Sequence, residues 1–215
     1  MNFKQTASAV AILCAFGIPS AAAQTMAVAT ADLNVRSGPG PQYEIIGVIS
    51  ADQRAQVDGC IEGSMWCRVS LGGQQGWAYS RYLAAERDGS RVVISERREA
   101  VPTVTYESTG RGAAGGAATG AIAGALIGGP IGAVVGGVAG AAVGASITPP
   151  EEVRTYVSSN PMDPVFLEGE VVVGARLPET VELHEVPSYE YRYVYVNRQP
   201  VLVEPGTRRI VYVYR

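Results

Sequence analysis

Residues 29–83 of this chain, ATADLNVRSGPGPQYEIIGVISADQRAQVDGCIEGSMWCRVSLGGQQGWAYSRYL, break up into several short strand-like runs. Leu33 and Val35 alternate with polar neighbours, and SGPGP follows them as a loop. The later runs are bounded by Gly, Asp or Ser, which favour turns. The stretch therefore predicts a small antiparallel β-barrel.

The chain begins with a segment that has the layout of a secretory signal peptide. Residues 1–23, MNFKQTASAVAILCAFGIPSAAA, place Lys4 ahead of an apolar run that ends in small residues. This layout predicts export and cleavage after Ala23. A lipidated Cys14 is the alternative, although more apolar sequence follows that cysteine.

Removal of the signal peptide leaves a weakly acidic chain. Lys4 is its only lysine, so the formal net charge changes from −3 to −4. A chain with this balance has no general electrostatic attraction to phosphate groups. Nucleic acid is therefore not predicted as a partner.

Two cysteines, Cys60 and Cys67, remain after the signal peptide is removed. A secretory route exposes them to an oxidising compartment, which favours a disulfide between them. If they lie on neighbouring strands around the EGSM turn, their side chains come within bonding reach. The chain-entropy model gives roughly 2.5 kcal/mol for closing so short a loop.

The order of the strand-like pieces is similar to that of a known family. LNVRSGPG, a Gly-Val strand, WCRV and GGQQGWAYSRYL follow one another between residues 27 and 83. This order resembles the bacterial SH3-like family. The resemblance implies an SH3-like domain over residues 24–85, and a module that binds peptidoglycan or a peptide or protein partner.

Polar and aromatic side chains of this domain are candidates for a ligand surface. Aromatic rings offer flat apolar faces to sugars or peptide side chains, and an arginine offers a forked donor to a carboxylate. Structural alternatives exist: Trp77 can be core packing, Trp66 can cover the disulfide, and Arg36 can be a solvated strand end. The candidate ligand-binding residues are Asn34, Arg36, Tyr43, Trp66, Trp77 and Tyr79, of which Tyr43 most favours a surface position.

Residues 86–111 mix charges of both signs with few large apolar side chains. This composition predicts a linker, which would let the SH3-like domain act at a distance from the segments that follow.

A glycine repeat occupies residues 112–148. A period of four places the glycines along the four-residue ridge of a helix, where they let two helices pack closely in a membrane. Because Pro130 breaks the run, the block predicts a hairpin of two helices, over 114–127 and 131–146. It resembles the glycine-zipper segments of Gram-negative envelope proteins. The predicted helix-packing residues are Gly116, Gly120, Gly124, Gly128, Gly132, Gly136, Gly140 and Gly144.

The length of the zipper does not decide whether it packs in a membrane or against other copies of the chain. Each arm extends roughly 21–24 Å, which is short of the ~30 Å hydrocarbon core of a bilayer. Shallow insertion into a membrane, a thinned site and packing into a homo-oligomer all fit this length. The alternative is a flexible glycine-rich linker with no packing role, but the block contains almost none of the Ser, Thr and charged residues that such linkers usually carry.

The C-terminal part of the chain becomes strand-like again after a second linker over residues 149–164. Tyrosines alternate between residues 189 and 195, and runs at 200–203 and 210–213 supply two further strands. Residues 165–215 therefore predict a small antiparallel sheet in which the tyrosines favour packing. The sequence from GARLPETVELHEVP onward resembles a C-terminal domain of unknown function in secreted Gram-negative envelope proteins. That resemblance implies location and shape but no activity.

No catalytic or cofactor motif is present in the sequence. His184 is the only histidine, and no second histidine or free cysteine completes a metal set. A nucleophile elbow, a phosphate loop and a Schiff-base lysine are all missing. The predictions are therefore that the protein is not an enzyme, that it has no catalytic residues, and that it binds no metal or cofactor.

Together these features predict a mainly β protein with a helical insert. The parts are a small SH3-like β-barrel, a glycine-zipper α-helical hairpin and a small C-terminal antiparallel β-sheet. The predicted function is that of a non-enzymatic periplasmic envelope protein, which binds peptidoglycan or a peptide or protein partner and is held to a membrane by residues 112–148. The alternative is a self-assembling or pore-forming protein built through the zipper.

Overall fold

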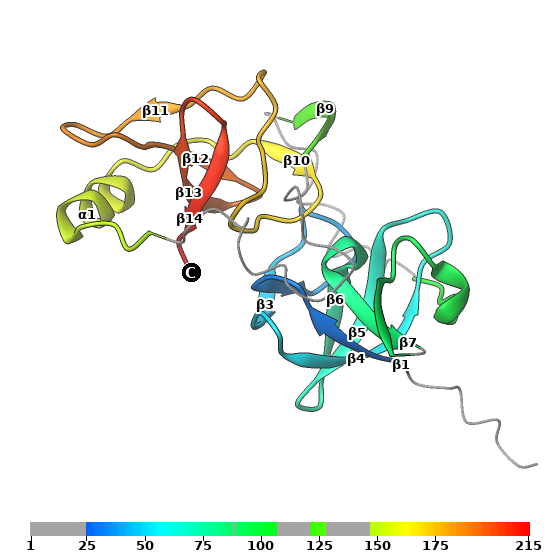
Figure 1. Cartoon of the computed structure of the whole chain (residues 1–215). Helices are drawn as coiled ribbons and strands as arrows, with labels where there is room; N and C mark the ends of the chain where they lie inside the picture. Colours follow the sequence, from blue (N-terminus) through cyan, green and yellow to red (C-terminus); the bar gives the residue numbers. More distant parts are fainter. Residues whose placement is uncertain (1–24, 88, 107–120, 128–146) are drawn as a thin grey trace, which may run out of the picture.

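A computed structural model describes residues 25–87, 89–106, 121–127 and 147–215. Within these residues it contains two β units, an N-terminal one drawn in blue to green and a C-terminal one in yellow to red (Figure 1). The fold is mainly β with antiparallel sheets, as predicted. The expected signal peptide, residues 1–23, lies outside the described residues.

The N-terminal unit is an eight-stranded antiparallel sheet whose strand order is β3-β2-β6-β5-β4-β1-β7-β8. Apolar residues at alternate positions of the strands point inward and form its core, as with Leu33, Val35, Val57 and Val69. The short 3-10 helix η1 (Ser80–Tyr82) connects β6 to β7. The strands are β1 (Thr25–Ala29), β2 (Leu33–Arg36), β3 (Ile45–Ile49), β4 (Arg54–Cys60), β5 (Trp66–Leu71), β6 (Gln74–Tyr79), β7 (Leu83–Arg87) and β8 (Ser90–Val93).

The segment predicted as a linker, residues 86–111, packs against the barrel over its described part. It contributes β8 and the 3-10 helix η2 (Arg98–Ala100). Its chain then runs beside β4, where the Cys60 amide donates to the Pro102 carbonyl at 2.8 Å. The linker prediction was wrong here because valines and a tyrosine in this charged segment find apolar partners on the barrel. Val101 is buried, and Val104 and Tyr106 pack against the same core.

The C-terminal unit is a four-stranded antiparallel sheet in the order β11-β12-β13-β14. The prediction of a sheet is confirmed, and the turn between β12 and β13 is formed by Asn197 and Arg198, both with positive φ. Asparagine tolerates this left-handed conformation in a two-residue hairpin. The strands are β11 (His184–Glu185), β12 (Arg192–Val196), β13 (Gln199–Glu204) and β14 (Arg209–Val213).

The second predicted linker, residues 149–164, contains the helix α1 (Glu151–Ser159). Val153 and Val157, one turn apart, are buried against the sheet. The hydroxyls of Tyr193 and Tyr195 donate to carbonyls at the C-terminal end of the helix, at 3.2 and 3.1 Å. The linker prediction was therefore wrong for this segment, and these two tyrosines hold a helix on the sheet.

The predicted first zipper helix, residues 114–127, is contradicted over its described part. Residues Ala121–Leu126 form strand β9, which pairs in parallel with β10 (Phe166–Glu168). Glycine disfavours a helix by about 1 kcal/mol, whereas the pairing with β10 gives the backbone hydrogen-bond partners. Gly124 therefore lies in a strand. The other predicted packing glycines, namely Gly116, Gly120, Gly128, Gly132, Gly136, Gly140 and Gly144, lie outside the described residues.

Within the part of the chain that the structure describes, no helix has the length and apolarity needed to cross a membrane.

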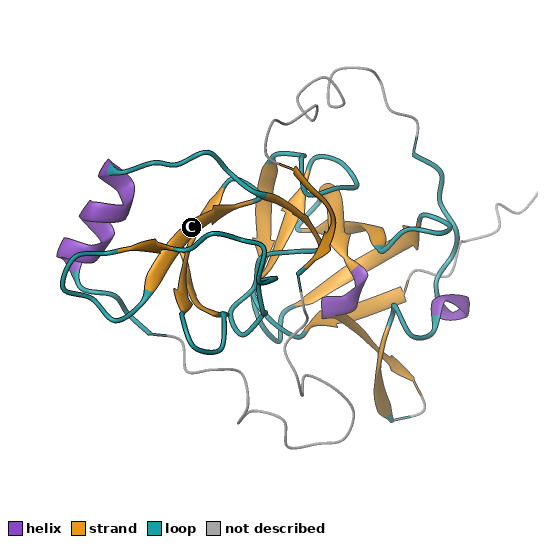
Figure 2. Cartoon of the chain, turned by 90° about the horizontal axis from the view of Figure 1, so that it is seen from above, coloured by secondary structure: helices purple, strands orange, loops and turns teal. Residues whose placement is uncertain are grey.

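The two β units share one hydrophobic core. Val194 and Val201 on one face of the C-terminal sheet belong to the same cluster of buried side chains as Leu33 and Val35 of the barrel. The opposite face, with Leu202, packs against α1. The C-terminal sheet thus lies between the barrel and the helix (Figures 1 and 2). The expectation that the SH3-like domain acts at a distance from the rest is not met in this structure.

Burial raises the pKa of Tyr214, near the chain end, to about 12 from an ordinary value of 10.0. Its hydroxyl is buried without a hydrogen-bond partner among the described residues, although its ring is only half-buried. Because the folded state holds the phenol proton more tightly, this contribution to stability is complete below pH ~10 and is lost as the pH rises through ~12.

Replacing Tyr214 with phenylalanine is therefore expected to reduce the loss of stability at alkaline pH. At pH 7 the variant should be as stable as the parent or up to about 1 kcal/mol more stable, since an unpaired buried hydroxyl is removed. Urea unfolding at pH 7 and pH 11 measures both effects. An alkaline loss equal to that of the parent would show that Tyr214 does not contribute to it.

Candidate functional site

Strand β2 carries two polar side chains, Asn34 and Arg36, that point away from the barrel core. Side chains alternate along a strand, so Leu33 and Val35 enter the core while Asn34 and Arg36 occupy the other face. In an isolated barrel that face would be exposed. Here Asn34 is 0% and Arg36 1% exposed, because the C-terminal unit covers them.

Arg36 binds the carboxylate of Glu170 with both prongs of its guanidinium. Nε lies 2.6 Å from Oε2, and Nη2 lies 2.6 Å from Oε1. Asn34 adds a hydrogen bond from Nδ2 to Oε1 at 3.0 Å, and the Val171 amide adds another at 2.9 Å. Glu170 is itself fully buried. This is the bidentate geometry that gives the strongest arginine–carboxylate pairs.

The loop that follows β2 orients the guanidinium of Arg36. Its remaining nitrogen, Nη1, donates to the carbonyls of Pro41 and Tyr43 at 3.0 and 2.8 Å. The loop SGPGP therefore folds back over the arginine that precedes it. Both residues that form the fork, Asn34 and Arg36, come from the motif LNVRSGPG.

Gly38 allows the ring of Tyr43 to lie over this loop, because a Cβ at residue 38 would lie 2.3 Å from ring atom Cδ1. We expect Gly38→Ala to displace the ring and to lower the free energy of unfolding by about 1–2 kcal/mol. Gly206→Ala is the matched control, since no atom lies within 4 Å of its Cβ position. Equal urea midpoints for the two variants would contradict this account.

Aromatic side chains form a wall beside the arginine. Tyr106 lies edge-on to both Tyr43 and Trp77, with ring centroids 6.1 and 5.3 Å apart. Trp77 is the register partner of Arg36 across the β2–β6 pair. Burial, followed by a hydrogen bond with Tyr106, raises the pKa of Tyr43. The expectation that Tyr43 lies at the surface was wrong, because Tyr106 covers it.

The structure divides the six candidate ligand residues into two groups. Asn34 and Arg36 bind the Glu170 carboxylate, whereas Tyr43 and Trp77 lie beside Arg36, in the loop after β2 and at the register-paired position of β6. Trp66 and Tyr79 are register partners on β5 and β6, and both are buried in the hydrophobic core that the two units share. Their ring centroids are 5.4 Å apart. All six side chains are buried, and their role in ligand binding stays a prediction.

Burial also raises the pKa of Tyr79, and the charges of Glu168 and Glu170 add to this shift while Arg81 opposes it. Burial raises the pKa of Tyr82 further. Both hydroxyls therefore stay neutral well above neutral pH.

Sequence reasoning missed two residues of the site, Glu170 and Gln199. The Gln199 Oε1 accepts a hydrogen bond from Asn34 Nδ2 at 2.8 Å. One signal for Glu170 was available, since this acid directly precedes the apolar run Val171–Val173. An acidic residue in such a run is buried only where it finds a partner.

The disulfide prediction is confirmed. Cys60 and Cys67 are register partners across β4 and β5 and are joined by a disulfide. The bond closes the hairpin whose strand β5 carries Trp66.

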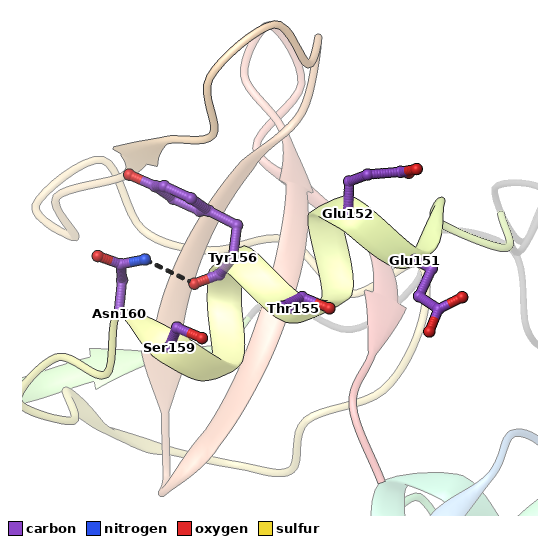
Figure 3. A pocket seen from close by; sticks show the side chains of 6 residues that line it. All are labelled: Glu151, Glu152, Thr155, Tyr156, Ser159 and Asn160. Carbon is purple, nitrogen blue, oxygen red and sulfur yellow. Dashed lines mark hydrogen bonds between the residues drawn. The ribbon is translucent and has the colours of Figure 1, made fainter.

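A shallow depression on the surface of α1 has a different character. It is lined by the side chains of Figure 3, all from the helix or its C-terminal cap. Asn160 caps the helix by donating from Nδ2 to the Tyr156 carbonyl at 2.8 Å. Since no second element closes over it, the depression is an open helix flank. Its lining residues are Glu151, Glu152, Thr155, Tyr156, Ser159 and Asn160.

His184 lies on the edge strand β11, with its ring 5.9 Å from that of Tyr193. Among the described residues, no three His, Cys, Asp or Glu side chains are grouped to hold a metal ion.

Comparisons with known proteins agree with the two resemblances seen in the sequence. Residues 31–84 match the model of the bacterial SH3 domain, and residues 156–215 match a domain of unknown function, DUF1236. The second match begins within α1. The chain therefore carries a bacterial SH3 domain followed by a DUF1236 domain.

The chain is also similar to one curated protein, YrvJ of Bacillus subtilis (strain 168), whose name assigns it to the N-acetylmuramoyl-L-alanine amidases. The two are 30% identical over 91 residues, which are 42% of this chain and 17% of that protein. This chain thus matches a small part of its relative. No solved structure matches the chain.

Proposed function

We propose that this protein is a non-enzymatic binding protein of the cell envelope, whose SH3 domain recognises carboxylate-bearing peptides of peptidoglycan. The observation that carries the proposal is the fork formed by Arg36 and Asn34, which holds a carboxylate through both of its oxygens. Peptidoglycan stem peptides end in carboxylates of this kind. The similarity to part of a protein named as an amidase of N-acetylmuramoyl-L-alanine supports the same class of ligand.

The chemistry of such a site is recognition without bond breaking. Arg36 is fixed by two loop carbonyls, so little side-chain freedom is lost when a carboxylate binds. Tyr43 and Trp77 lie beside it under the ring of Tyr106, and they would offer apolar faces to the rest of a peptide once that ring is displaced. The site therefore selects a carboxylate next to a small apolar group.

Location forms the second part of the proposal. We infer export to the periplasm, on the basis of residues 1–23, and attachment of the repeat within residues 112–148 to a membrane or to a second copy of the chain. Separation of inner and outer membranes, followed by immunodetection, tests the first attachment. Chemical crosslinking of the mature chain tests the second. A monomer confined to the soluble periplasmic fraction would remove this part of the proposal.

Co-sedimentation of the mature chain with purified peptidoglycan sacculi tests the binding function. We expect the parent to sediment with sacculi and Arg36→Met to be retained at least tenfold less. Arg54→Met is the matched control, because its side chain is 71% exposed on the same domain. Circular dichroism checks that each variant is folded.

Sacculi whose free carboxylates have been converted to amides provide the control on the ligand side. The parent protein should co-sediment with amidated sacculi as weakly as Arg36→Met co-sediments with native sacculi. Equal retention of the parent by native and amidated sacculi would refute recognition through the carboxylate.

A further inference from the structure

We propose that Glu170 is an internal ligand of the SH3 domain, which closes the site until a peptide with a carboxylate and an adjacent N–H donor displaces it. The proposal rests on the proposed function for the identity of the natural ligand. It adds the chemical class of the competing group and the way in which the site is regulated.

The first argument is the origin of the contacts. Glu170 belongs to the C-terminal unit, whereas Arg36 and Asn34 belong to the barrel, more than 130 residues earlier in the chain. The barrel residues supply three of the donors to the carboxylate, and only the Val171 amide comes from its own unit. A ligand carboxylate placed at the same point would meet the same three donors.

The second argument is an incomplete fit. Asn34 Nδ2 donates to both Glu170 and Gln199, which fixes the orientation of the amide. Its Oδ1 is buried and accepts no hydrogen bond among the described residues. A buried acceptor without a partner is unfavourable. An N–H group next to the bound carboxylate would satisfy it, and the glutamate side chain has no such group.

The third argument is the backbone that carries Glu170. The residue lies in a loop after β10, between Gly169 and Gly174, both with positive φ. Glycines tolerate a change of backbone path at both ends of this loop, while Val171 and Val172 between them are fully buried in the core that the two units share. Arg215 makes a further contact between the units, from Nη2 to the Asp32 carbonyl at 2.8 Å, and its side chain is partly exposed. Opening of the site therefore needs movement of the Glu170 loop, which breaks the polar contacts named here and exposes Val171 and Val172 from the shared core.

The consequence is competition within one chain. If the closed state predominates, the apparent affinity for an outside carboxylate falls by the fraction of molecules that are open. Removing the charge of Glu170 while keeping its shape should raise that affinity. Glu170→Gln does this, and Glu168→Gln is the matched control because Glu168 is exposed two residues away.

Isothermal titration of the mature chain with N-acetyl-D-alanine tests the proposal, since this probe has a carboxylate next to an N–H. Glu170→Gln should bind it at least tenfold more tightly than the parent, and Glu168→Gln should match the parent. Glu170→Gln should not raise the affinity for the amide N-acetyl-D-alaninamide. It should raise the affinity for propionate, which lacks the N–H, by less than the affinity for N-acetyl-D-alanine. If Glu170→Gln does not fold, Glu170→Asp takes its place, because the shorter side chain cannot reach both nitrogens of Arg36.

The outcomes separate this inference from the proposed function. If Glu170→Gln binds N-acetyl-D-alanine tenfold more tightly than the parent, but the parent does not co-sediment with sacculi, Glu170 is an internal ligand and peptidoglycan is not its competitor. Equal affinity of the parent and Glu170→Gln, in a protein that sediments with sacculi through Arg36, would overturn the internal ligand and leave wall binding intact. The internal-ligand proposal would also be overturned if neither Glu170→Gln nor Glu170→Asp bound N-acetyl-D-alanine at millimolar concentration.

Discussion

Glu170→Ala is expected to lower the free energy of unfolding of the mature chain by about 3–5 kcal/mol, the usual cost of removing one partner from a buried ion pair. The loss arises because Arg36 stays 1% exposed while its Nε and Nη2 lose their acceptor. The Asn34 amide loses one of its two acceptors as well. Urea unfolding followed by the fluorescence of the two tryptophans measures the change.

A double-mutant cycle tests whether the ion pair is the cause. Arg36→Met combined with Glu170→Met replaces both charges by apolar side chains, so it should cost less than the sum of the single changes. Glu168→Ala, at an exposed position in the same segment, should change stability by less than about 0.5 kcal/mol. Additive effects of the two methionine substitutions would contradict a direct coupling between the residues.

The strands of the barrel could be predicted from the sequence because their signals are local. The alternation of Leu33 and Val35 with polar neighbours, and turn residues such as those in SGPGP, act within a few residues of each other. The pairing of Cys60 with Cys67 spans only seven residues and one turn. The three strands β12 to β14 were found for the same reason.

The partner of Arg36 could not be predicted in this way. The polar face of β2 reads as a solvated or ligand-binding face, and nothing near it shows that a distant segment covers it. The contact to Glu170 spans 134 residues. The only hint was an acid beside an apolar run, which says that a partner exists but does not identify it. The same applies to Tyr43, whose cover is Tyr106 from a charged segment.

The error at β9 has a different cause. The four-residue glycine period was read as a helix ridge, yet glycine is a poor helix former and leaves the decision to tertiary contacts. Over Ala121–Leu126 that contact is strand pairing with β10, and the Ile127 amide then donates to the Glu168 carbonyl at 3.0 Å. Ile127 is buried in the common core. The end of the described part of the repeat is therefore fixed next to the segment that carries Glu170.

Reduction of the disulfide is expected to lower the free energy of unfolding by roughly 2.5 kcal/mol, the chain-entropy value for a loop of this length. Cys60 and Cys67 are both buried, and the bond joins β4 and β5 at the end of their hairpin. The Cys60 backbone also pairs with residues 102–104 through two hydrogen bonds. These backbone bonds do not involve the sulfur atoms, so they hold the segment on β4 in the reduced protein as well.

Urea unfolding of the mature chain with and without reductant gives the comparison in which no side chain has been replaced. The double variant Cys60→Ala and Cys67→Ala should be destabilised by at least as much, since it also loses two buried sulfur atoms, and it should not respond to reductant.

A thiol assay on the oxidised protein should detect no free thiol. Because the bond acts mainly on the unfolded chain, the parent should bind sacculi equally well before and after reduction under conditions where it stays folded. A parent that keeps its urea midpoint in reductant, with both thiols shown to be free, would mean that the hairpin is already fixed by its strands and by the segment that packs on Cys60.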